Sequence, residues 1–356
     1  MESVPVLPVL KPQRHTNPLR LRPGFPSFQA PQANRSAQQN VSVEKDRSWL
    51  KDSSLQRRRP LRPSVSVLPP MRFLQPTVTT SQVYAESAAG MIKGTVKSEN
   101  QDCYFEQSHG SCRAMAICDG HGSTGAAVSS FICQKLPVLL FRKAAKREIQ
   151  SMKAALKASM EEANQLLKES NVDVKAAGST CVAVMAIDNL LICGNIGDSR
   201  AVVGRLIDNI WAVYQLSWDH KPEREIDRIL AAGGEVAGSK TGRGGPMRVY
   251  VKGELYPGLS MSRCMGHTSA EKAGVISDPD FQAIQLTASD KFLVVGSDGL
   301  WRVFSSMEAV RFVSALYLSD PAGLCKALVT EAQRRWLQKG STVDDITVIV
   351  ATFASK

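Results

Sequence analysis

Runs of apolar residues at successive positions recur through the second part of the chain. Such runs, bounded by Gly and Asp, are typical of strands in sheets that are covered on both faces. The pattern predicts strands at residues 114–118, 180–187, 190–196, 201–206, 211–216, 292–295 and 346–353.

A second spacing, of three and four residues, predicts two helices. Lys and Glu lie opposite the apolar stripe of the first, which is therefore amphipathic. That stripe consists of Met152, Leu156, Met160, Ala163 and Leu167. The second helix is expected to begin with Asp320 as its N-cap and Pro321 in its first helical position. Its apolar stripe consists of Leu324, Leu328 and Ala332.

The order of these elements indicates the fold class. Consecutive strands at short spacing, followed by helices, favour a layered α+β domain over an alternating doubly wound sheet. We find no internal repeat. The longest apolar run covers residues 136–141 and is far shorter than the roughly 20 residues that span a bilayer, so we expect no membrane span.

The positive charge is concentrated near the N-terminus. The 356 residues carry a net charge of +11, and residues 1–80 hold 13 Lys and Arg against 4 Asp and Glu, together with 12 of the 18 prolines. The whole chain is 43% hydrophobic, so most of it can bury a core. We therefore expect a disordered, basic, Pro-rich arm over residues 1–80 and a globular domain over residues 81–356.

Three interpretations of this arm stay open. It is a solvated tail, an organelle-targeting segment, or a nuclear-import or anion-binding patch around Arg57, Arg58 and Arg59. Because the globular part carries little of the charge, we do not expect it to bind nucleic acid. The eight cysteines form no C-x-x-C pair, which is typical of free thiols in a reducing compartment. We expect a cytoplasmic or nuclear location, with organelle targeting by the arm still open.

Acidic residues lie at the ends of strands in five turns. These turns contain Asp102, Asp119, Asp198, Asp298 and the pair Asp344-Asp345. A single Asp-Gly is usually only a turn, because Asp caps its own backbone and Gly tolerates positive φ. Five such turns favour a cation site, since converging carboxylates repel one another unless a cation lies between them. Oxygen ligands without clustered His or Cys suit Mg²⁺ or Mn²⁺ rather than zinc.

Eight short motifs follow one another in a fixed order. They are Asp119-Gly120-His121-Gly122, Ala177-Gly178-Ser179-Thr180, Gly197-Asp198-Ser199-Arg200, Asp219-His220-Lys221-Pro222, Ala231-Ala232-Gly233-Gly234, Pro257-Gly258-Leu259-Ser260-Met261-Ser262-Arg263, Ser297-Asp298-Gly299-Leu300-Trp301 and Asp344-Asp345-Ile346-Thr347-Val348. Over about residues 83 to 354 the chain thus resembles the metal-dependent serine/threonine protein phosphatases of type 2C. The resemblance implies a four-layer α-β-β-α sandwich, in which helices flank two antiparallel sheets.

The resemblance also implies a hydrolase with two divalent ions, Mg²⁺ or Mn²⁺. Asp119 would bridge both ions, the carbonyl of Gly120 would bind one, and Asp298 and Asp344 would hold the other. Asp102 would orient the water that the ions share. This water would hydrolyse phosphoserine or phosphothreonine in proteins, without a covalent enzyme intermediate.

The resemblance also implies roles for two further residues, and four residues differ from the family's commonest pattern. His121 fits the family's general acid, which protonates the leaving oxygen. Lys97 stands where many relatives carry the arginine that grips phosphate. Gln101 occupies a position often filled by a metal-binding glutamate, and His267 replaces the aspartate that ends Ser-Arg-x-x-Gly-Asp. Arg302 replaces an aspartate of a third, weaker metal site; we expect that metal to be lost and the bridging pair to remain.

Two hypotheses of function result. The first is an active phosphatase on phosphoproteins, and the second is a catalytically weak phosphatase-like module that binds phosphoproteins or a regulatory partner. His267 and Arg302 motivate the second, and an ion pair of Arg302 with Asp298 or Asp198 would compete with metal. We expect a monomer. The segment from Asp219 to about Pro257 corresponds to the family's flap, where the Gly-rich turn at 242–245 is either a mobile substrate-facing surface or an ordinary solvated loop.

Overall fold

The structure is a computed structural model, and it describes residues 78–143, 148–242 and 245–355. The expected arm over residues 1–80 lies almost entirely outside the described residues, as do residues 243 and 244 of the Gly-rich turn. Within the described residues, none of the helices is both long and apolar enough to cross a bilayer. All eight cysteines are free thiols.

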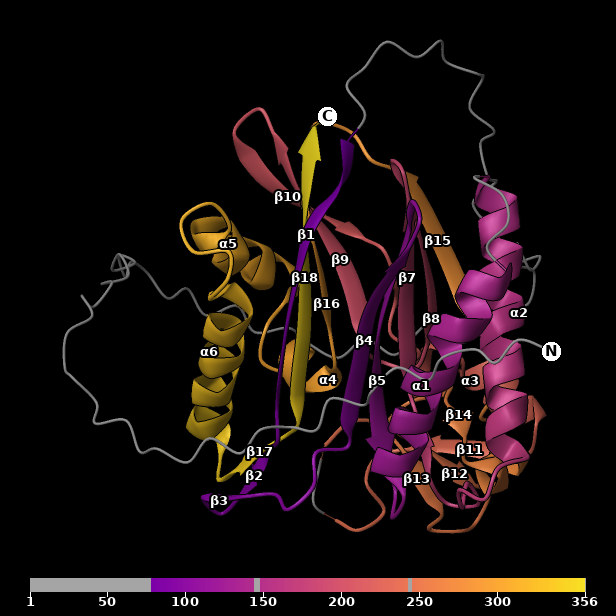
Figure 1. Cartoon of the computed structure of the whole chain (residues 1–356). Coiled ribbons are helices and arrows are strands. Elements are labelled where there is room, and N and C mark those ends of the chain that lie inside the picture. Colours follow the sequence, from indigo (N-terminus) through magenta and orange to yellow (C-terminus); the bar gives the residue numbers. More distant parts are fainter. Residues whose placement is uncertain (1–77, 144–147, 243–244, 356) are drawn as a thin grey trace, which may run out of the picture. The chain divides into compact units, whose positions relative to one another are not determined.

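Two antiparallel sheets form the centre of the domain (Figure 1). The five-stranded sheet has the order β1 (Val78–Ala88), β18 (Ile346–Ser355), β16 (Asp290–Gly296), β9 (Arg200–Ile207) and β10 (Ile210–Gln215). The seven-stranded sheet has the order β14 (Met265–Gly266), β6 (Gly178–Ser179), β5 (Cys112–His121), β7 (Cys181–Ile187), β8 (Leu190–Ile196) and β15 (Asp280–Gln285), with β4 (Asp102–His109) paired to β5. The α+β class with antiparallel sheets is confirmed. The seven predicted segments fall on strands apart from Thr180 and Leu216, which lie just outside β7 and β10, and the run at 190–196 coincides with β8.

Helices pack on the outer side of each sheet. In Figure 1, α1 (Gly125–Lys143) and α2 (Ile149–Lys168) lie to the right of the sheets, and α5 (Ser306–Leu316) and α6 (Leu324–Lys339) lie to the left. Three apolar clusters join the layers. On β5, Ala116 belongs to the cluster under α1 and α2, whereas Ile117 belongs to the cluster between the two sheets. Because successive residues of a strand point to opposite faces, a strand buried on both faces must be apolar at consecutive positions.

The helices confirm one sequence prediction and correct another. All five residues of the expected stripe on α2 are buried. The second predicted helix, α6, begins at Leu324 rather than at Pro321, and its N-cap is Gly323. Asp320 instead closes the preceding turn, because its Oδ1 accepts a hydrogen bond of 3.0 Å from the Gly323 N–H.

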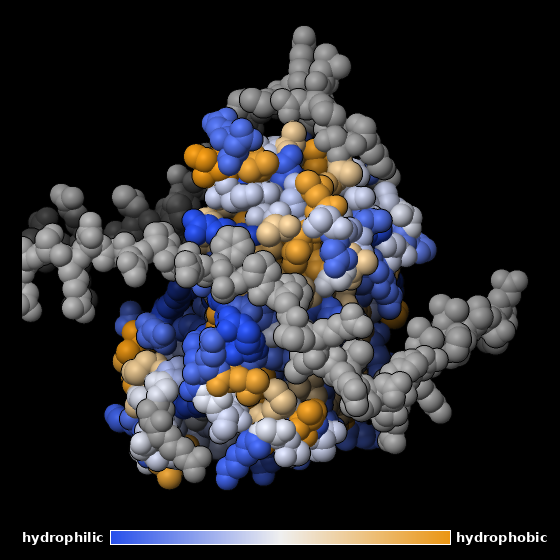
Figure 2. Space-filling view, turned by 90° about the vertical axis from the view of Figure 1, so that its left-hand side faces the viewer, coloured by the Kyte–Doolittle hydropathy of each residue, from blue (hydrophilic) through white to orange (hydrophobic). Residues whose placement is uncertain are grey.

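The outer face of α6 is charged. Arg334 and Arg335 both form ion pairs with Glu331, at N–O distances of 2.6 and 3.0 Å. Figure 2 looks at the side of the molecule that carries α5 and α6, and it shows a large hydrophilic area near the middle of this side. Charged residues outside and apolar residues inside explain why this helix packs on the sheet with one face only.

The expected flap is a small subdomain with its own sheet. It contains α3 (Ile226–Ala231), β11 (Gly234–Ala237), β12 (Arg248–Val251) and β13 (Pro257–Leu259). Ile229 and Val249 are fully buried in its core. At the start of β12, Arg248 donates a hydrogen bond of 2.5 Å to the carbonyl oxygen of Gly258.

A further small sheet pairs β2 (Met91–Ile92) with β3 (Thr95–Val96) and β17 (Thr342–Val343). The sequence did not predict it, because strands of two residues carry no periodicity. Through this pairing the chain before Lys97 lies beside the chain before Asp344.

Candidate metal centre

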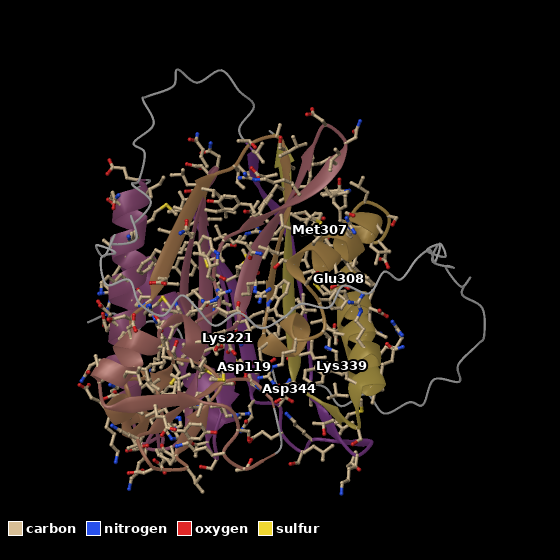
Figure 3. The ribbon with its side chains drawn as sticks, turned by 180° about the vertical axis from the view of Figure 1, so that it is seen from behind. Asp119, Lys221, Met307, Glu308, Lys339 and Asp344 are labelled. Carbon is tan, nitrogen blue, oxygen red and sulfur yellow. The ribbon has the colours of Figure 1, made fainter. Side chains whose placement is uncertain are left out.

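Five aspartates, which together form the carboxylate centre, occupy the same end of the two large sheets. Asp102 lies at the start of β4, Asp119 near the end of β5, and Asp198 in the turn between β8 and β9. Asp298 begins α4 (Asp298–Trp301), and Asp344 lies just before β18. Antiparallel pairing brings these chain ends together, since the Cα of Asp102 is opposite that of Asp119, and Gly296 is opposite both Arg200 and Val348. Figure 3 labels Asp119 and Asp344 at this end, with Lys221 nearby.

The carboxylates influence one another electrostatically. Burial raises the pKa of Asp119 well above its usual range, and the negative charges of Asp102 and Asp298 raise it further. Burial also raises the pKa of Asp102 to about 7, and burial together with the charge of Asp198 raises that of Asp298 to about 7. Negative charge is therefore concentrated here and is stabilised by any cation that binds.

Arg302 supplies one such positive charge. Its Nη2 lies 2.7 Å from Oδ2 of Asp298, and its Nη1 lies 3.9 Å from Oδ2 of Asp344. The expected ion pair between Arg302 and Asp298 is thus present, and the guanidinium bridges two of the three expected metal-binding aspartates. A metal ion at these two carboxylates has to compete with it.

Two lysines neutralise further carboxylates. Lys97 Nζ lies 3.2 Å from Asp344 and 3.3 Å from Asp345, so it reaches the predicted centre. Lys221 Nζ lies 2.5 Å from Oδ2 of Asp198. Lys221 belongs to one of the eight motifs, but its residue type alone predicted no contact with Asp198. Asp345 is structural: it accepts hydrogen bonds from the backbone N–H groups of Gly90 and Gln101.

Two buried carboxylate oxygens of the aspartates lack a hydrogen-bond partner among the described residues. Oδ1 of Asp102 and Oδ1 of Asp198 are buried without a hydrogen bond in the described part of the chain. Among the described residues, no three of the five aspartates offer ligand atoms within 4.8 Å of one another, so an ion held by three of them requires these side chains to move closer together. The candidate ligands contributed by these aspartates are carboxylate oxygens, and such donors fit Mg²⁺ or Mn²⁺.

The backbone of Gly120 lies against the start of α1. A Cβ atom at this position would lie 2.2 Å from the carbonyl oxygen of Gly125 and 2.7 Å from that of Gln101. The Gly120 N–H donates a hydrogen bond of 3.0 Å to the same Gln101 oxygen. Only glycine fits this close approach of strand and helix. The Gln101 side chain also donates a hydrogen bond to the carbonyl of Gly122, so this residue braces the turn.

The side chain of His121 contacts the side chain of His267. Its Nε2 lies 3.0 Å from Nδ1 of His267, and its own Nδ1 is buried without a partner. Burial, and next the neighbouring His267, lower the pKa of His121 to about 3. The imidazole is therefore neutral near pH 7 in the free protein.

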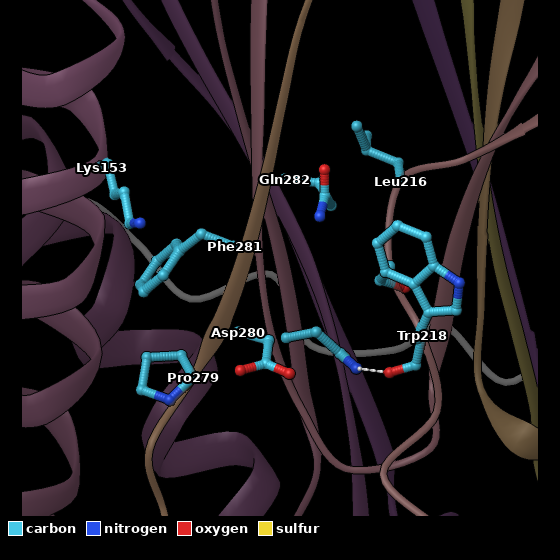
Figure 4. Close-up of a pocket in the computed structure, with 9 residues that line it drawn as sticks. Lys153, Leu216, Trp218, Pro279, Asp280, Phe281 and Gln282 are labelled. Atoms are coloured by element: carbon cyan, nitrogen blue, oxygen red, sulfur yellow. Dashed lines mark hydrogen bonds between the residues drawn. The ribbon is translucent and has the colours of Figure 1, made fainter. Parts of the chain in front are cut away.

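A separate pocket of about 360 Å³ contains none of the predicted site residues (Figure 4). Lys153, Trp218 and Phe281 are among its lining residues. The dashed line in Figure 4 marks the 2.9 Å hydrogen bond that Asn195 donates to the carbonyl of Trp218. This pocket does not contribute to the carboxylate centre.

Comparison with known proteins agrees with this architecture. The family model of protein phosphatase 2C matches residues 87–339. Probable protein phosphatase 2C 61 of Arabidopsis thaliana is 33% identical over 271 residues, which cover 73% of this chain and 82% of the relative. The integrin-linked kinase-associated serine/threonine phosphatase 2C of Mus musculus is 32% identical over 260 residues, covering 66% of this chain and 61% of that protein.

Solved structures show the same fold. A serine-threonine phosphatase 2C from Toxoplasma gondii superposes with a TM-score of 0.67 at 19% identity, covering 79% of this chain and 98% of that one. A sex-determining protein of C. elegans has a TM-score of 0.63 at 22% identity, covering 76% and 64%. Together with the match over most of the globular part, these similarities show that the chain belongs to the protein phosphatase 2C family, whose members are metal-dependent serine/threonine protein phosphatases.

Proposed function

We propose that this protein hydrolyses phosphoserine and phosphothreonine in proteins at the carboxylate centre, with two Mg²⁺ or Mn²⁺ ions. The observation that carries the proposal is the convergence of Asp119, Asp298 and Asp344 from three distant parts of the chain. Besides burial, the charges of Asp298 and Asp344 raise the pKa of Asp119, and the charge of Asp344 raises that of Asp298. Bound divalent ions would lower the pKa of a water molecule and neutralise the phosphoryl oxygens.

The protein residues would hold and orient the reactants. Asp119 and the carbonyl of Gly120 would bind one ion, and Asp119, Asp298 and Asp344 would bind the other. Asp102 would orient the attacking water through its unpartnered Oδ1, while its Oδ2 is fixed by a 2.8 Å hydrogen bond from Ser297. This bond fixes the carboxylate plane, which matters because orientation is a large part of catalysis.

Lys97 and His121 would act on the substrate. Lys97 would exchange part of its ion pairing with Asp344 for the phosphoryl group, because both partners are oxyanions. His121 has to take up a proton before it can donate one to the leaving oxygen. A phosphomonoester dianion beside the ring favours the protonated imidazole, since an opposite charge stabilises the charged form.

One observation favours the second candidate, a catalytically weak module that binds phosphoproteins or a partner. Arg302 already neutralises Asp298 at 2.7 Å and reaches Asp344 at 3.9 Å. If this ion pair persists at physiological metal concentration, the second ion is absent and hydrolysis is slow. The centre would then still present Lys97 and Lys221 to an anionic ligand.

A metal-dependent phosphatase assay tests the proposal and separates it from the weak module. The full chain is mixed with phosphoserine and phosphothreonine peptides while Mn²⁺ is varied. We expect saturable, Mn²⁺-dependent phosphate release, and a loss of at least about 100-fold in Asp119→Asn because charge stabilisation at the reacting group is lost. The matched control is Asp227→Asn, which changes an exposed carboxylate of α3 and should retain activity. Equal rates in both variants, or release without divalent metal, would contradict the proposal.

A further inference from the structure

Three metal-binding side chains of a different chemical type lie beside the carboxylate centre. They are His121 at the end of β5, Cys264 just before β14, and His267 just after β14. Each offers one ligand atom, and the three atoms lie within 4.8 Å of one another. Within the described residues, no other group of three His, Cys, Asp or Glu meets this spacing.

The strand order brings these side chains together. Gly178 on β6 is paired with His121 on one side and with Gly266 on the other. A Cβ atom on Gly178 would lie 3.0 Å from Nε2 of His121. Because Gly178 has no side chain, the imidazole can extend across β6 toward β14. His267 meets it from there, with a backbone φ of 44° that places it in the left-handed region.

A chain of hydrogen bonds fixes the tautomer of His267. The hydroxyl of Ser269 donates to the carbonyl of Lys175, so it accepts from the hydroxyl of Tyr256. The Tyr256 oxygen must then accept the proton of His267 Nε2, at 2.6 Å. Nδ1 of His267 therefore carries a lone pair, and it is this atom that faces His121.

We propose that His121, Cys264 and His267 bind a zinc ion, separate from the Mg²⁺ or Mn²⁺ centre. Two nitrogens on one tetrahedral zinc ion, at about 2.0–2.1 Å each, are about 3.3 Å apart. The imidazole nitrogens are 3.0 Å apart, so a small movement suffices. Tyr256 supplies the outer hydrogen bond that a metal-binding histidine typically makes.

The ligand types select zinc over the ions of the carboxylate centre. Imidazole and thiolate suit zinc, whereas Mg²⁺ and Mn²⁺ prefer oxygen ligands. Cys264 and His267 are only 2% and 4% exposed, so the ion would be shielded from water on two sides. Three protein ligands leave a fourth position for water, as in open zinc sites.

Zinc at this site would inhibit the phosphatase, and this consequence alone rests on the proposed function. A zinc ion on the His121 ring takes up a nitrogen lone pair and holds the ring in place. The zinc-bound imidazole keeps its remaining proton on Nδ1, which is buried, so it cannot donate a proton to the leaving serine or threonine oxygen. Added Mg²⁺ would not relieve this inhibition, because the two ions bind to different atoms.

Cobalt substitution tests the site without requiring any enzymatic activity. Co²⁺ is added to the full chain in the presence of excess Mg²⁺, which fills the carboxylate centre. We expect a thiolate-to-cobalt charge-transfer band and tetrahedral visible bands, which one equivalent of Zn²⁺ abolishes. No band, or a band unchanged in Cys264→Ser, would overturn the proposal.

The variants are chosen to separate metal binding from folding. His267→Asn removes a ligand, and Asn tolerates the left-handed backbone, so the variant should fold and lose the band. Tyr256→Phe should weaken zinc binding by about 10- to 100-fold, as is typical for the loss of an outer partner. The control Cys133→Ser changes a buried thiol that contacts Cys103 and should keep the band. Loss of the band in this control, with retention in His267→Asn, would place the metal elsewhere and refute the site.

Phosphatase activity provides the second measurement. Each variant is compared with its own rate without zinc. We expect zinc to inhibit the natural protein and to inhibit Cys264→Ser at a concentration at least about 100-fold higher, since even outer partners contribute 10- to 100-fold. If the band forms but no phosphatase activity is found, the proposed function fails and the zinc site stands. If the protein is an active phosphatase that forms no band, the zinc site alone fails.

Discussion

Arg302 contacts two of the three aspartates that would bind metal at the carboxylate centre. Its guanidinium pairs with Asp298 at 2.7 Å and reaches Asp344 at 3.9 Å. Arg302→Asp removes this competitor and adds a carboxylate. We expect the Mn²⁺ concentration for half-maximal binding, measured by calorimetry, to fall by about tenfold or more, because ligand charge strongly sets the affinity for divalent ions.

The control for this prediction is Arg311→Asp. It makes the same change of charge at an exposed position of α5 and should leave Mn²⁺ affinity unchanged. If both variants bound Mn²⁺ more tightly than the natural protein by the same factor, long-range charge rather than the ion pair with Asp298 would set the Mn²⁺ affinity. If neither differed from the natural protein, Arg302 would not compete with metal.

Residue spacing explains which contacts were predictable. The pair of Asp298 and Arg302 is four residues apart on a helical turn, so its contact follows from local geometry. The contact between His121 and His267 spans 146 residues and depends on the register of β5, β6 and β14. The sequence identified His267 as a departure from the family but gave no indication that it would meet His121 and Cys264.

At the scale of the element, the close contact between β5 and α1 leaves no room for a side chain at Gly120. A methyl group on Gly120 would lie 2.2 Å from the carbonyl oxygen of Gly125. We expect Gly120→Ala to lower the free energy of unfolding by about 1–3 kcal/mol, the usual cost of overpacking, in urea unfolding experiments. Gly238→Ala is the control, since no atom lies within 4 Å of its added methyl group. Equal free energies of unfolding for the two variants would show that β5 and α1 can move apart to accommodate the methyl group.

The flap subdomain contains an acid-sensitive contact. Burial alone would raise the pKa of Glu225, but hydrogen bonds from Arg263, Ser262 and Arg228 lower it to about 2, below its ordinary value of 4.5. The folded state therefore favours the ionised form. This stabilisation is fully present above pH 4.5 and disappears as the pH falls through 2.

Glu225→Gln should show this pH dependence directly. At pH 7 we expect it to unfold with a free energy about 3 kcal/mol lower than the natural protein, and we expect the difference to shrink toward pH 2. Urea unfolding at several pH values measures the difference. Glu254→Gln, an exposed change in the same subdomain, should show no difference at any pH. A difference for Glu225→Gln that stayed constant with pH would contradict the ionic explanation.

At the scale of elements, burial decided what could be predicted. The central strands could be identified by their continuous runs of apolar residues, because both faces of these strands are covered. Helix α1 was not predicted, because it contains Pro137 and buries residues such as Ile132 and Leu140 on a broad face, which weakens the helical periodicity. The start of α6 was misplaced because Asp320 and Pro321 form a turn that resembles a helix start.

For the whole molecule, most of the net charge and the residues of the carboxylate centre lie in different segments of the sequence. Residues 1–77 hold 13 basic and 4 acidic residues, so their deletion lowers the net charge from +11 to +2. We expect the remaining chain, which contains the whole carboxylate centre, to keep its Mn²⁺-dependent activity. Binding to a fluorescent oligonucleotide at low salt, measured by anisotropy, should fall strongly, since such binding depends on the number of basic groups that meet phosphates. Unchanged oligonucleotide binding after the deletion would instead assign nucleic-acid affinity to the phosphatase domain, and lost activity would assign the N-terminal segment a part in catalysis.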